Sequence, residues 1–344
     1  MKISGITTGT DHEQVMTAED PALGYRGIIA IHSTRLGPAV GGTRVWHYNT
    51  FDHALQDVLR LSRGMTFKNA AAGLPLGGGK SVIMVNGMLP DRRDLFRAHG
   101  QFVESFGGRY ITAEDAGSSP ADMAFVREAT THVAGLAELS GDPSPVTAHG
   151  VFRAMQATLM HLHGTTSLAG KRVAVQGVGH VGYHLAEELY RAGAHLVLAD
   201  IDESAVSRCV SRLGATRASP EDIHRQIVDI FAPCALGGTI NARTIPELGC
   251  AVIAGAANNQ LGDANDASLL AERGIAYAPD YIANAGGVIN GSREILGWTA
   301  EYAAEKVEGI FDTMLQVFQS ASRESITTAE AADRLAMVML ARGA

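Results

Sequence analysis

Two lysines and one aspartate in the first third of the sequence are of types that could act on a small polar substrate. Lys68 lies in RGMTFKNAAAG, Lys80 follows three glycines in GLPLGGGKSV, and Asp115 comes just after the run RYITA. A lysine held in a tight, partly desolvated backbone pocket has a lowered pKa and can act as a general base. One lysine for a carboxylate, and a second lysine with an aspartate for proton transfer, would suit an α-amino or α-hydroxy acid.

The string GGGKS also resembles the end of a phosphate-binding loop, G-x-x-x-x-G-K-[ST]. The first glycine of that motif would be residue 74, which is leucine. The motif therefore fails, and hydrolysis of a nucleoside triphosphate loses its main support.

Glycines in a second stretch have the spacing of a dinucleotide-binding turn. The run VAVQGVGHVGYHLAEEL contains Gly177, Gly179 and Gly182 as G-x-G-x-x-G, with His180 and Val181 before the last glycine. The first glycine permits the tight bend, the second lets backbone approach a pyrophosphate, and the third lets helix and strand pack closely. A strand pattern precedes the motif and a helical pattern follows it, so the helix N-terminus would face the phosphates. The alternative is a glycine-rich turn without a ligand.

An acidic residue further on indicates which dinucleotide the turn would bind. Asp200 ends the next strand-like run, 200 − 177 = 23 positions after Gly177. A carboxylate about 20 residues after the first glycine accepts a hydrogen bond from a ribose 2′-hydroxyl. Because this carboxylate would repel a 2′-phosphate, we expect NAD and not NADP. Asp202 is a second candidate for the same role.

The elements that must position these residues alternate between strand and helix patterns. The expected strands are 27–32, 81–85, 109–113, 171–176, 195–200, 228–233 and 251–256. The expected helices are 51–63, 91–106, 149–163, 180–191, 203–212, 299–320 and 327–342. We expect Gly64 to end the first of these helices. The regular alternation after residue 171 predicts a parallel sheet, and the Ser-, Gly- and Pro-rich residues 139–145 predict a hinge or linker.

Composition and charge disfavour several classes of function. The 344 residues carry 28 basic and 36 acidic side chains, a net charge of −8, which argues against non-specific binding to nucleic acids or anionic membranes. No stretch approaches the about 18 uninterrupted apolar residues of a membrane span, and the first residues lack a signal-peptide pattern. Three cysteines without C-x-x-C spacing favour neither disulfides nor a zinc site. We expect a cytoplasmic protein without a metal cofactor.

Eight strings spread from about residue 13 to residue 335 carry a resemblance to a known family. They are LGPAVGGTR, GMTFKNAAAGLPLGGGKSVI, ITAEDAG, PSPVTAHGVF, VAVQGVGHVGYHL, DIFAPCALGG, AGAANNQL and YAPDYIANAGGVIN. Together they resemble the Glu/Leu/Phe/Val dehydrogenase family, in particular its short leucine, valine and phenylalanine members. The resemblance implies a homo-oligomer of an α/β chain with two domains and an active-site cleft between them. Residues 1–138 with the C-terminal helix 327–344 would form the substrate and oligomerisation domain, and residues 139–326 a Rossmann-type NAD-binding domain.

The same resemblance implies a reaction and a role for each motif. The reaction would be the reversible oxidative deamination of an L-amino acid to a 2-oxo acid and ammonia, with NAD as hydride acceptor. Lys80 would activate water, and Asp115 would exchange protons with the substrate amine. Lys68 would bind the substrate carboxylate, helped by Gly42 and Asn259, and Gly41 would also contact the substrate. The nicotinamide and ribose of the cofactor would lie near Thr147, Asn258 and Asn284, and Ala235 would also lie near the cofactor.

The residues that match the family's substrate side-chain pocket are apolar, and small or flexible. They are Val40, Met65, Ala113, Val288 and Gly291. Such a pocket disfavours a charged side chain. Ala113 resembles the aliphatic-specific members. Gly291 departs from the leucine-type members and would enlarge the pocket, and the following REILGW resembles the phenylalanine branch. We expect a leucine, valine or isoleucine type of substrate, with phenylalanine or tryptophan as the alternative.

Two other classes of function compete with this interpretation. A catalytically silent sensor of NAD and amino acids would not need a base, so the complete set Lys68, Lys80 and Asp115 argues against it. A hydroxy-acid dehydrogenase is not favoured by the strings GAANNQ and GGGK.

Overall fold

The computed structural model of the chain describes residues 1–85, 91–136 and 141–343. Contacts within the chain divide it into two compact units. The first unit comprises Met1–Asp142, Gly291–Trp298 and Ala336–Ala344, and the second comprises Pro143–Asn290 and Thr299–Leu335. The domain boundaries implied by the family resemblance stay a prediction, and the expected linker at 139–145 lies partly outside the described residues.

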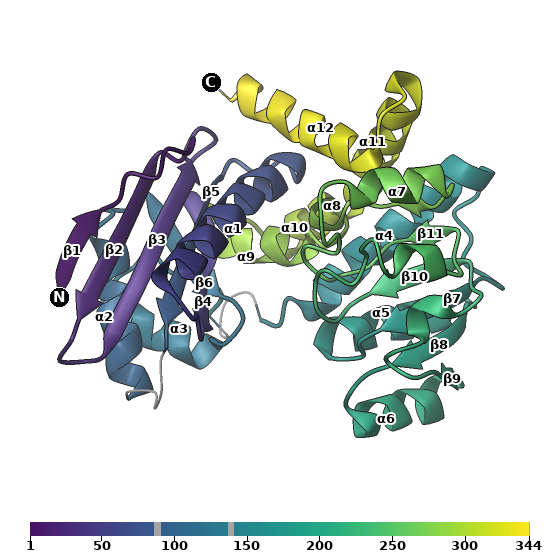
Figure 1. The fold of residues 1–344 in the computed structure, drawn as a ribbon, viewed down its shortest axis with the longest axis horizontal. Helices are drawn as coiled ribbons and strands as arrows, with labels where there is room; N and C mark the ends of the chain where they lie inside the picture. The colour runs from purple at the N-terminus through teal and green to yellow at the C-terminus, as the bar shows by residue number, and fades with distance from the viewer. Residues whose placement is uncertain (86–90, 137–140, 344) are drawn as a thin grey trace. The chain divides into compact units, whose positions relative to one another are not determined.

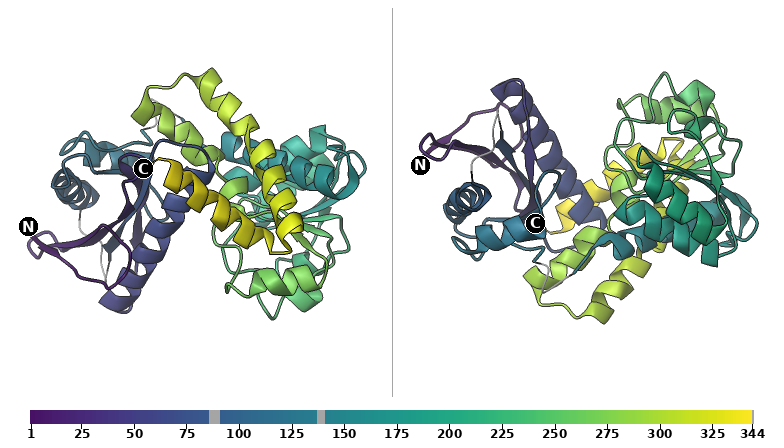
Figure 2. Two further views of the ribbon diagram at one scale, coloured as in Figure 1. Left: turned by 90° about the horizontal axis from the view of Figure 1, so that it is seen from above. Right: turned by 90° about the horizontal axis from the view of Figure 1, so that it is seen from below.

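The first unit is built on a six-stranded mixed sheet (Figures 1 and 2). Its strands are β1 (Lys2–Gly5), β2 (Gln14–Asp20), β3 (Tyr25–Ser33), β4 (Ala39–Trp46), β5 (Gly77–Met84) and β6 (Tyr110–Glu114). Their order in the sheet is β1-β2-β3-β5-β4-β6. The pairs β1–β2, β2–β3 and β3–β5 are antiparallel, and β4 runs parallel to both of its neighbours, β5 and β6. Strand β5 is buried along its whole length, so Lys80 lies inside the sheet.

Helices cover both faces of this sheet. Helix α1 (Phe51–Ala71) packs on one face, where Val58 joins a cluster with Ile28 and Val82. Helices α2 (Arg92–Glu104) and α3 (Pro120–Arg127) pack on the other face, around a larger apolar core. Successive strand residues point to opposite faces. Since Val82 faces α1, Lys80 shares the α1 face and Ser81 faces α2.

The expectation that Gly64 ends the first helix was wrong. Helix α1 begins at Phe51, where the Thr50 side chain accepts a hydrogen bond from the His53 N–H, and it continues through Gly64 to Ala71. A glycine within a helix costs only about 1 kcal/mol relative to alanine. Beyond Gly64 the helix buries Thr66, Phe67, Asn69, Ala70 and Ala71. Burial of this face outweighs the local cost of the glycine.

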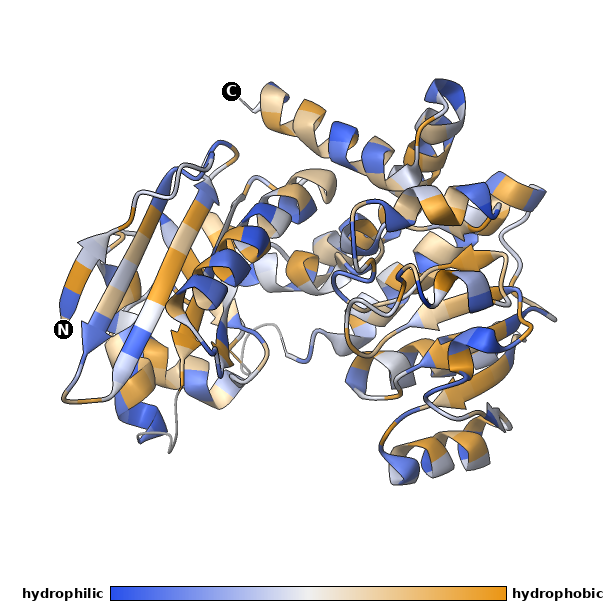
Figure 3. Cartoon of the chain, in the orientation of Figure 1, coloured by the Kyte–Doolittle hydropathy of each residue, from blue (hydrophilic) through white to orange (hydrophobic). Residues whose placement is uncertain are grey.

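The second unit contains a six-stranded sheet whose strand pairs are all parallel. Its strands are β7 (Arg172–Gln176), β8 (His195–Ala199), β9 (Thr216–Arg217), β10 (Ile230–Pro233), β11 (Val252–Ile253) and β12 (Ala276–Tyr277). The order β12-β11-β10-β7-β8-β9 is the doubly wound order of dinucleotide-binding sheets. Figure 3 shows hydrophobic residues along β7, β8 and β10, as expected for strands covered on both faces. The predicted α/β class and parallel sheet are confirmed.

The remaining helices pack around this second sheet or connect the units along the chain. They are α4 (Ser144–His163), α5 (His180–Arg191), α6 (Glu203–Leu213), α7 (Asp266–Glu272), α8 (Asp280–Ala283), α9 (Gly286–Leu296), α10 (Ala300–Glu308), α11 (Ile310–Glu324) and α12 (Thr328–Arg342). The single helix expected at 299–320 is two helices, α10 and α11, separated at Gly309. The strand expected at 251–256 is only Val252–Ile253. Among the described residues, no helix is both long and apolar enough to cross a membrane.

Candidate active site

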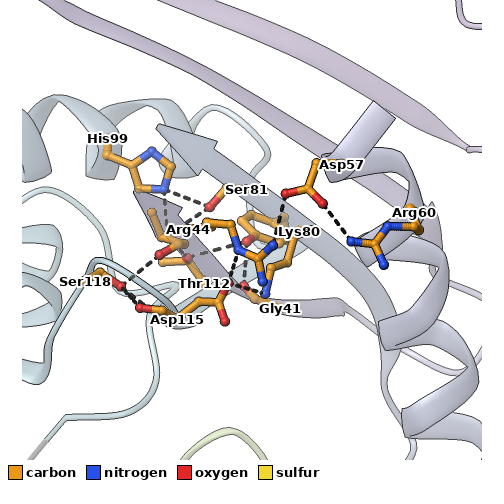
Figure 4. Close-up of polar contacts among 12 residues, drawn as sticks. Gly41, Arg44, Asp57, Arg60, Lys80, Ser81, His99, Thr112, Asp115 and Ser118 are labelled. Atoms are coloured by element: carbon orange, nitrogen blue, oxygen red, sulfur yellow. Dashed lines mark hydrogen bonds and ion pairs between the residues drawn. The ribbon is translucent and has the colours of Figure 1, made fainter. Parts of the chain in front are cut away.

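Lys80, Asp115 and Arg44 form a charged cluster in the first unit (Figure 4). The Lys80 Nζ and the Arg44 Nε each lie 3.0 Å from the Asp115 Oδ2. The Lys80 side chain is 7% exposed, and those of Asp115 and Arg44 are 21% and 22% exposed. Two cations therefore share one carboxylate oxygen in a largely buried position.

The charge state of Asp115 follows from these neighbours. Burial alone would raise the pKa of its carboxyl group, but the charges of Lys80 and Arg44 and the hydrogen bonds from Lys80 and the Ala116 N–H lower it to about 2. Opposite charges at this distance favour the ionised form. At neutral pH, Asp115 is a carboxylate that can accept a proton from a bound group.

Adjacent parallel strands bring these side chains together. In the order β5-β4-β6, Lys80 comes from β5, Arg44 from β4, and Asp115 from the residue after β6. Arg44 pairs with Val82 of β5, and Gly42 of β4 pairs with Ala113 of β6. The register thus places groups that are far apart in the sequence within hydrogen-bond distance.

A buried polar network lies on the opposite face of the same three strands. The Thr43 Oγ1 lies 2.6 Å from the Thr112 Oγ1 and accepts a hydrogen bond of 2.8 Å from the Ser81 hydroxyl. The His99 Nε2 lies 3.0 Å from the Thr43 Oγ1, and its Nδ1 lies 2.8 Å from the Tyr25 hydroxyl. Burial lowers the pKa of His99 to about 3, so the ring is neutral at physiological pH. Each strand contributes one hydroxyl, and the network fixes the strands that carry the charged cluster.

The predicted substrate-binding glycines, Gly41 and Gly42, are required by packing. A Cβ at Gly41 would lie 1.8 Å from the Gly79 oxygen. A Cβ at Gly42 would lie 2.3 Å from the Glu114 oxygen and 2.8 Å from the Asp115 Cβ. Their lack of side chains lets β4 approach β5 and lets Asp115 lie against β4.

Most of the predicted substrate residues belong to the first unit. Besides the glycines and the charged pair, these are Val40, Met65, Lys68, Ala113 and Gly291. The Met65 Cγ lies 3.4 Å from the Cβ position of Gly41, and Lys68 follows about one turn later on α1. A Cβ at Gly291 would meet nothing within 4 Å. Val288 and Asn259 belong to the second unit, so their place beside these residues stays a prediction.

The glycine turn of the second unit lies between β7 and α5 and has room for a ligand. Gly177 has φ +94°, which disfavours any side chain, and a Cβ at Gly182 would lie 1.9 Å from the Gly177 oxygen. Gly179 is exposed at the start of α5, and a Cβ there would meet nothing within 4 Å. Internal packing therefore explains Gly177 and Gly182 but not Gly179. Bare backbone before His180 and Val181, the first residues of α5, fits an approaching pyrophosphate.

The two candidate ribose-binding acids differ in their surroundings. The Asp200 Oδ2 accepts a hydrogen bond of 2.7 Å from the Val178 N–H, which fixes the carboxylate against the glycine turn. The Asp202 Oδ1 instead accepts from the N–H groups of Ser204 and Ala205, at 2.9 and 3.2 Å, and caps α6. Asp200 is thus the better placed candidate.

An asparagine pair lies among the residues predicted to adjoin the nicotinamide. The Asn284 Nδ2 donates hydrogen bonds to the Asn258 Oδ1 at 2.9 Å and to the Ala256 oxygen at 3.1 Å. The Asn284 Oδ1 is buried and has no hydrogen-bond partner among the described residues. Because a buried acceptor without a donor is costly, this oxygen fits a site for a ligand that donates a hydrogen bond.

Two further predicted cofactor residues adjoin glycines of the second unit. The Thr147 Oγ1 would lie 2.7 Å from a Cβ at Gly287, at the start of α9. The Ala235 Cβ would lie 2.9 Å from a Cβ at Gly177. Ala235 therefore lies beside the dinucleotide turn, at the switch between β7 and β10, where doubly wound sheets bind ligands.

Sequence reasoning missed Arg44, Asp57 and His99. Arg44 is separated by one residue from the glycine pair in LGPAVGGTR, so its place in a motif was an available signal. Asp57 and His99 lie within amphipathic helices, where no spacing marks them. Among the described residues, no group of three or more His, Cys, Asp or Glu side chains could hold a metal ion.

The sequence matches two descriptions of one protein family over most of its length. Residues 12–132 match the "Glu/Leu/Phe/Val dehydrogenase, dimerisation domain". Residues 140–207 and 199–343 match "Glutamate/Leucine/Phenylalanine/Valine dehydrogenase".

Known proteins are similar over nearly the whole chain. A leucine dehydrogenase of Geobacillus stearothermophilus is 51% identical over 95% of this chain and 90% of its own length. A phenylalanine dehydrogenase of Lysinibacillus sphaericus is 46% identical over 94% of this chain and 87% of its own. The crystal structure of L-tryptophan dehydrogenase from Nostoc punctiforme has a TM-score of 0.85 at 42% identity and covers 97% of both chains.

Proposed function

Because the chain belongs to the Glu/Leu/Phe/Val dehydrogenase family, we propose that it catalyses the NAD-dependent oxidative deamination of an apolar L-amino acid. The products are the 2-oxo acid, ammonia and NADH, and the reaction is reversible. The observation that carries the proposal within the first unit is the contact of 3.0 Å between the Lys80 Nζ and the Asp115 Oδ2. A binding protein without chemistry has no need of a buried lysine paired with an ionised carboxylate.

The second unit supports NAD as the cofactor. NAD, when bound, accepts the hydride that leaves Cα of the amino acid. Gly179 and the N-terminus of α5 suit its pyrophosphate, and the buried Asn284 Oδ1 suits a donor such as a carboxamide. The carboxylate of Asp200 suits a ribose 2′-hydroxyl and disfavours a 2′-phosphate. Thr147, Asn258 and Ala235 complete the proposed cofactor site.

The residues of the first unit account for the proton transfers. Lys68 binds the substrate carboxylate, with Gly41 and Gly42 beside it. Asp115 takes a proton from the substrate ammonium group, so that the nitrogen lone pair can support loss of the hydride from Cα. Lys80 then removes a proton from the water that attacks the resulting iminium carbon. Asp115 returns a proton to nitrogen and ammonia leaves, while the hydroxyl group that came from water loses its remaining proton to solvent and becomes the keto oxygen.

The preferred substrate is proposed to be leucine, valine or isoleucine. The proposed pocket of Val40, Met65, Ala113, Val288 and Gly291 has no charged side chain, which disfavours glutamate. The 51% identity to a leucine dehydrogenase supports an aliphatic substrate. The open space at Gly291 favours the second candidate, a phenylalanine or tryptophan preference.

We also propose that the enzyme is a cytoplasmic homo-oligomer. The family describes the segment that residues 12–132 match as a dimerisation domain. Cys209, Cys234 and Cys250 are all free thiols, a state that a reducing compartment maintains.

The experiment that tests the function is a panel of amino acids with the purified protein and NAD. Leucine, valine, isoleucine, phenylalanine, tryptophan and glutamate are supplied separately, and NADH is followed by absorbance. We expect NADH with the apolar amino acids and the highest kcat/KM with an aliphatic one. No NADH with any of them, despite measurable NAD binding, would indicate a silent sensor and refute the proposal.

A further inference from the structure

Arg44 links the proposed catalytic carboxylate to helix α1 (Figure 4). Its Nε lies 3.0 Å from the Asp115 Oδ2, and its Nη1 lies 3.0 Å from the Asp57 Oδ2. Asp57 is itself held by the Tyr48 hydroxyl at 2.7 Å and by the Arg60 Nη2 at 2.9 Å. A guanidinium is planar and its donors have fixed directions. Anchored at both ends, it restricts where the Asp115 carboxylate can lie.

We propose that Arg44, anchored by Asp57, is a positioning residue that holds the Asp115 carboxylate in place for proton exchange with the substrate nitrogen. The inference rests on the proposed function, in which Asp115 exchanges those protons and Lys80 activates water. It adds a role for two residues to which the proposed mechanism gives none.

The need for Arg44 follows from the changes of charge during turnover. Lys80 and Arg44 contact the same oxygen of Asp115. As the base, Lys80 must be neutral before it takes a proton from water, so a carboxylate paired with Lys80 alone would lack a counter-charge in that part of the cycle. Burial opposes the charge of Arg44, but Asp115 and Asp57 raise its pKa further above the usual range. Arg44 therefore remains a cation, and Asp115 keeps a fixed partner throughout.

Other titratable groups lie on the elements next to Asp115, and an Arg44 substitution leaves them in place. Tyr110 and Glu114 come from β6, Tyr48 precedes α1, and Asp57 and Lys68 come from α1. Asp57 and Lys68 are eleven residues apart, or about three turns, so they lie on the same face of the helix. Burial raises the pKa of both tyrosines, so both are neutral in the assay range.

The test compares Arg44→Gln with Arg44→Lys, which keeps a cation near Asp115. Arg60→Gln is the matched control, because Arg60 also contacts Asp57 but its side chain is 56% exposed. Kinetics are measured from pH 4 to pH 10, and crystal structures are determined for wild type and Arg44→Gln. The pKa of Asp115 is about 2 in the wild type, so its acidic limb in the kcat/KM profile lies below the measured range. An arginine beside an aspartate lowers its pKa by about 1–3, so in Arg44→Gln the limb should move up and enter the range at its acidic end. In Arg44→Lys the acidic limb should return most of the way to its wild-type position, and in Arg60→Gln it should stay at the wild-type position.

The outcomes separate this proposal from the proposed function. We expect kcat of Arg44→Gln to fall more than KM rises, and its Asp115 carboxylate to turn from the wild-type position. A folded Arg44→Gln enzyme with the wild-type profile and an unmoved carboxylate would overturn the inference. If Arg44→Gln does not fold, the crystal structure of Asp57→Asn should show the Asp115 carboxylate turned from its wild-type position, and an unmoved carboxylate there would count against the inference. If wild type makes no NADH with any amino acid, the proposed function fails, and the crystal structures still decide whether Arg44 positions Asp115.

Discussion

Replacing Lys80 with methionine tests the proposal that the first unit carries out proton transfer and the second unit binds NAD. The variant lacks the ammonium group at Asp115 but keeps a buried side chain of similar length. General acid–base groups contribute about 100- to 10,000-fold to turnover, so kcat should fall by that factor. This corresponds to about 2.7–5.5 kcal/mol of activation free energy. NAD binding should change little, because the proposed cofactor residues lie in the second unit and Lys80 lies in the first.

The lowered pKa of Asp115 sets an upper limit on the folding free energy that Lys80→Met can lose. Its pKa is lowered from 3.8 to about 2, which corresponds to roughly 2 kcal/mol in favour of the folded, ionised state. Because the folded pKa lies below the ordinary value, this stabilisation is present above about pH 4 and is lost as pH falls toward 2. Lys80 is one of two cations 3.0 Å from Asp115. The variant should therefore lose only part of that free energy and remain folded at neutral pH.

Three measurements on Lys80→Met decide the outcome: NADH formation with leucine, NAD binding by calorimetry, and thermal unfolding. Lys171→Met is the control, since Lys171 pairs with Asp229 at 3.5 Å in the second unit and should leave turnover unchanged. A folded Lys80→Met variant with the wild-type kcat would remove Lys80 from its role. Loss of NAD binding in that variant would refute the assignment of the two functions to separate units.

Four substitutions give further predictions. Gly182→Ala should destabilise the protein by about 1–3 kcal/mol in thermal unfolding, because its Cβ would lie 1.9 Å from the Gly177 oxygen. In Gly179→Ala the added Cβ would meet nothing within 4 Å, so the Tm should stay unchanged. Because the same Cβ would stand where the pyrophosphate is proposed to approach the backbone, calorimetry should show weaker NAD binding. Gly291→Val should lower kcat/KM for phenylalanine relative to leucine by about tenfold or more; equal ratios would place Gly291 outside the pocket. Hydrogen bonding to a glutamate of α5 raises the pKa of His149 from 6.5 to about 9, so the stability that its charge adds is complete below pH 6.5 and lost as pH rises through 9. The Tm difference between wild type and His149→Gln should shrink over that interval.

Local patterns in the sequence predicted the second unit better than the first. The glycine spacing and alternating elements after residue 171 correctly indicated the parallel sheet, because each βα unit carries its own signal. Gly64 was misread because its local helix cost is smaller than the burial gained beyond it. Strand β4 was missed because its glycines weaken the strand pattern, although those glycines let β4 approach β5.

The contacts within the candidate site could not be predicted from local sequence patterns either. Residue types and motifs singled out Lys80 and Asp115, but their contact depends on the order β5-β4-β6, which no local pattern contains. Arg44 contacts Asp115, which is 71 residues away in the sequence, and Asp57 acts only through Arg44. His99 is an unremarkable helix residue until its buried hydroxyl partners are known. Long-range pairing, and not local propensity, assembles this part of the site.

The transfer of hydrogen from the substrate to NAD tests the central claim most directly. L-leucine deuterated at Cα is incubated with the enzyme and NAD, and the reduced cofactor, the 2-oxo acid and ammonia are quantified by mass spectrometry and enzymatic assay. The proposed reaction predicts one deuterium in each reduced cofactor, with equal amounts of the three products. Loss of the deuterium to water, or a 2-oxo acid formed without reduced cofactor, would contradict it.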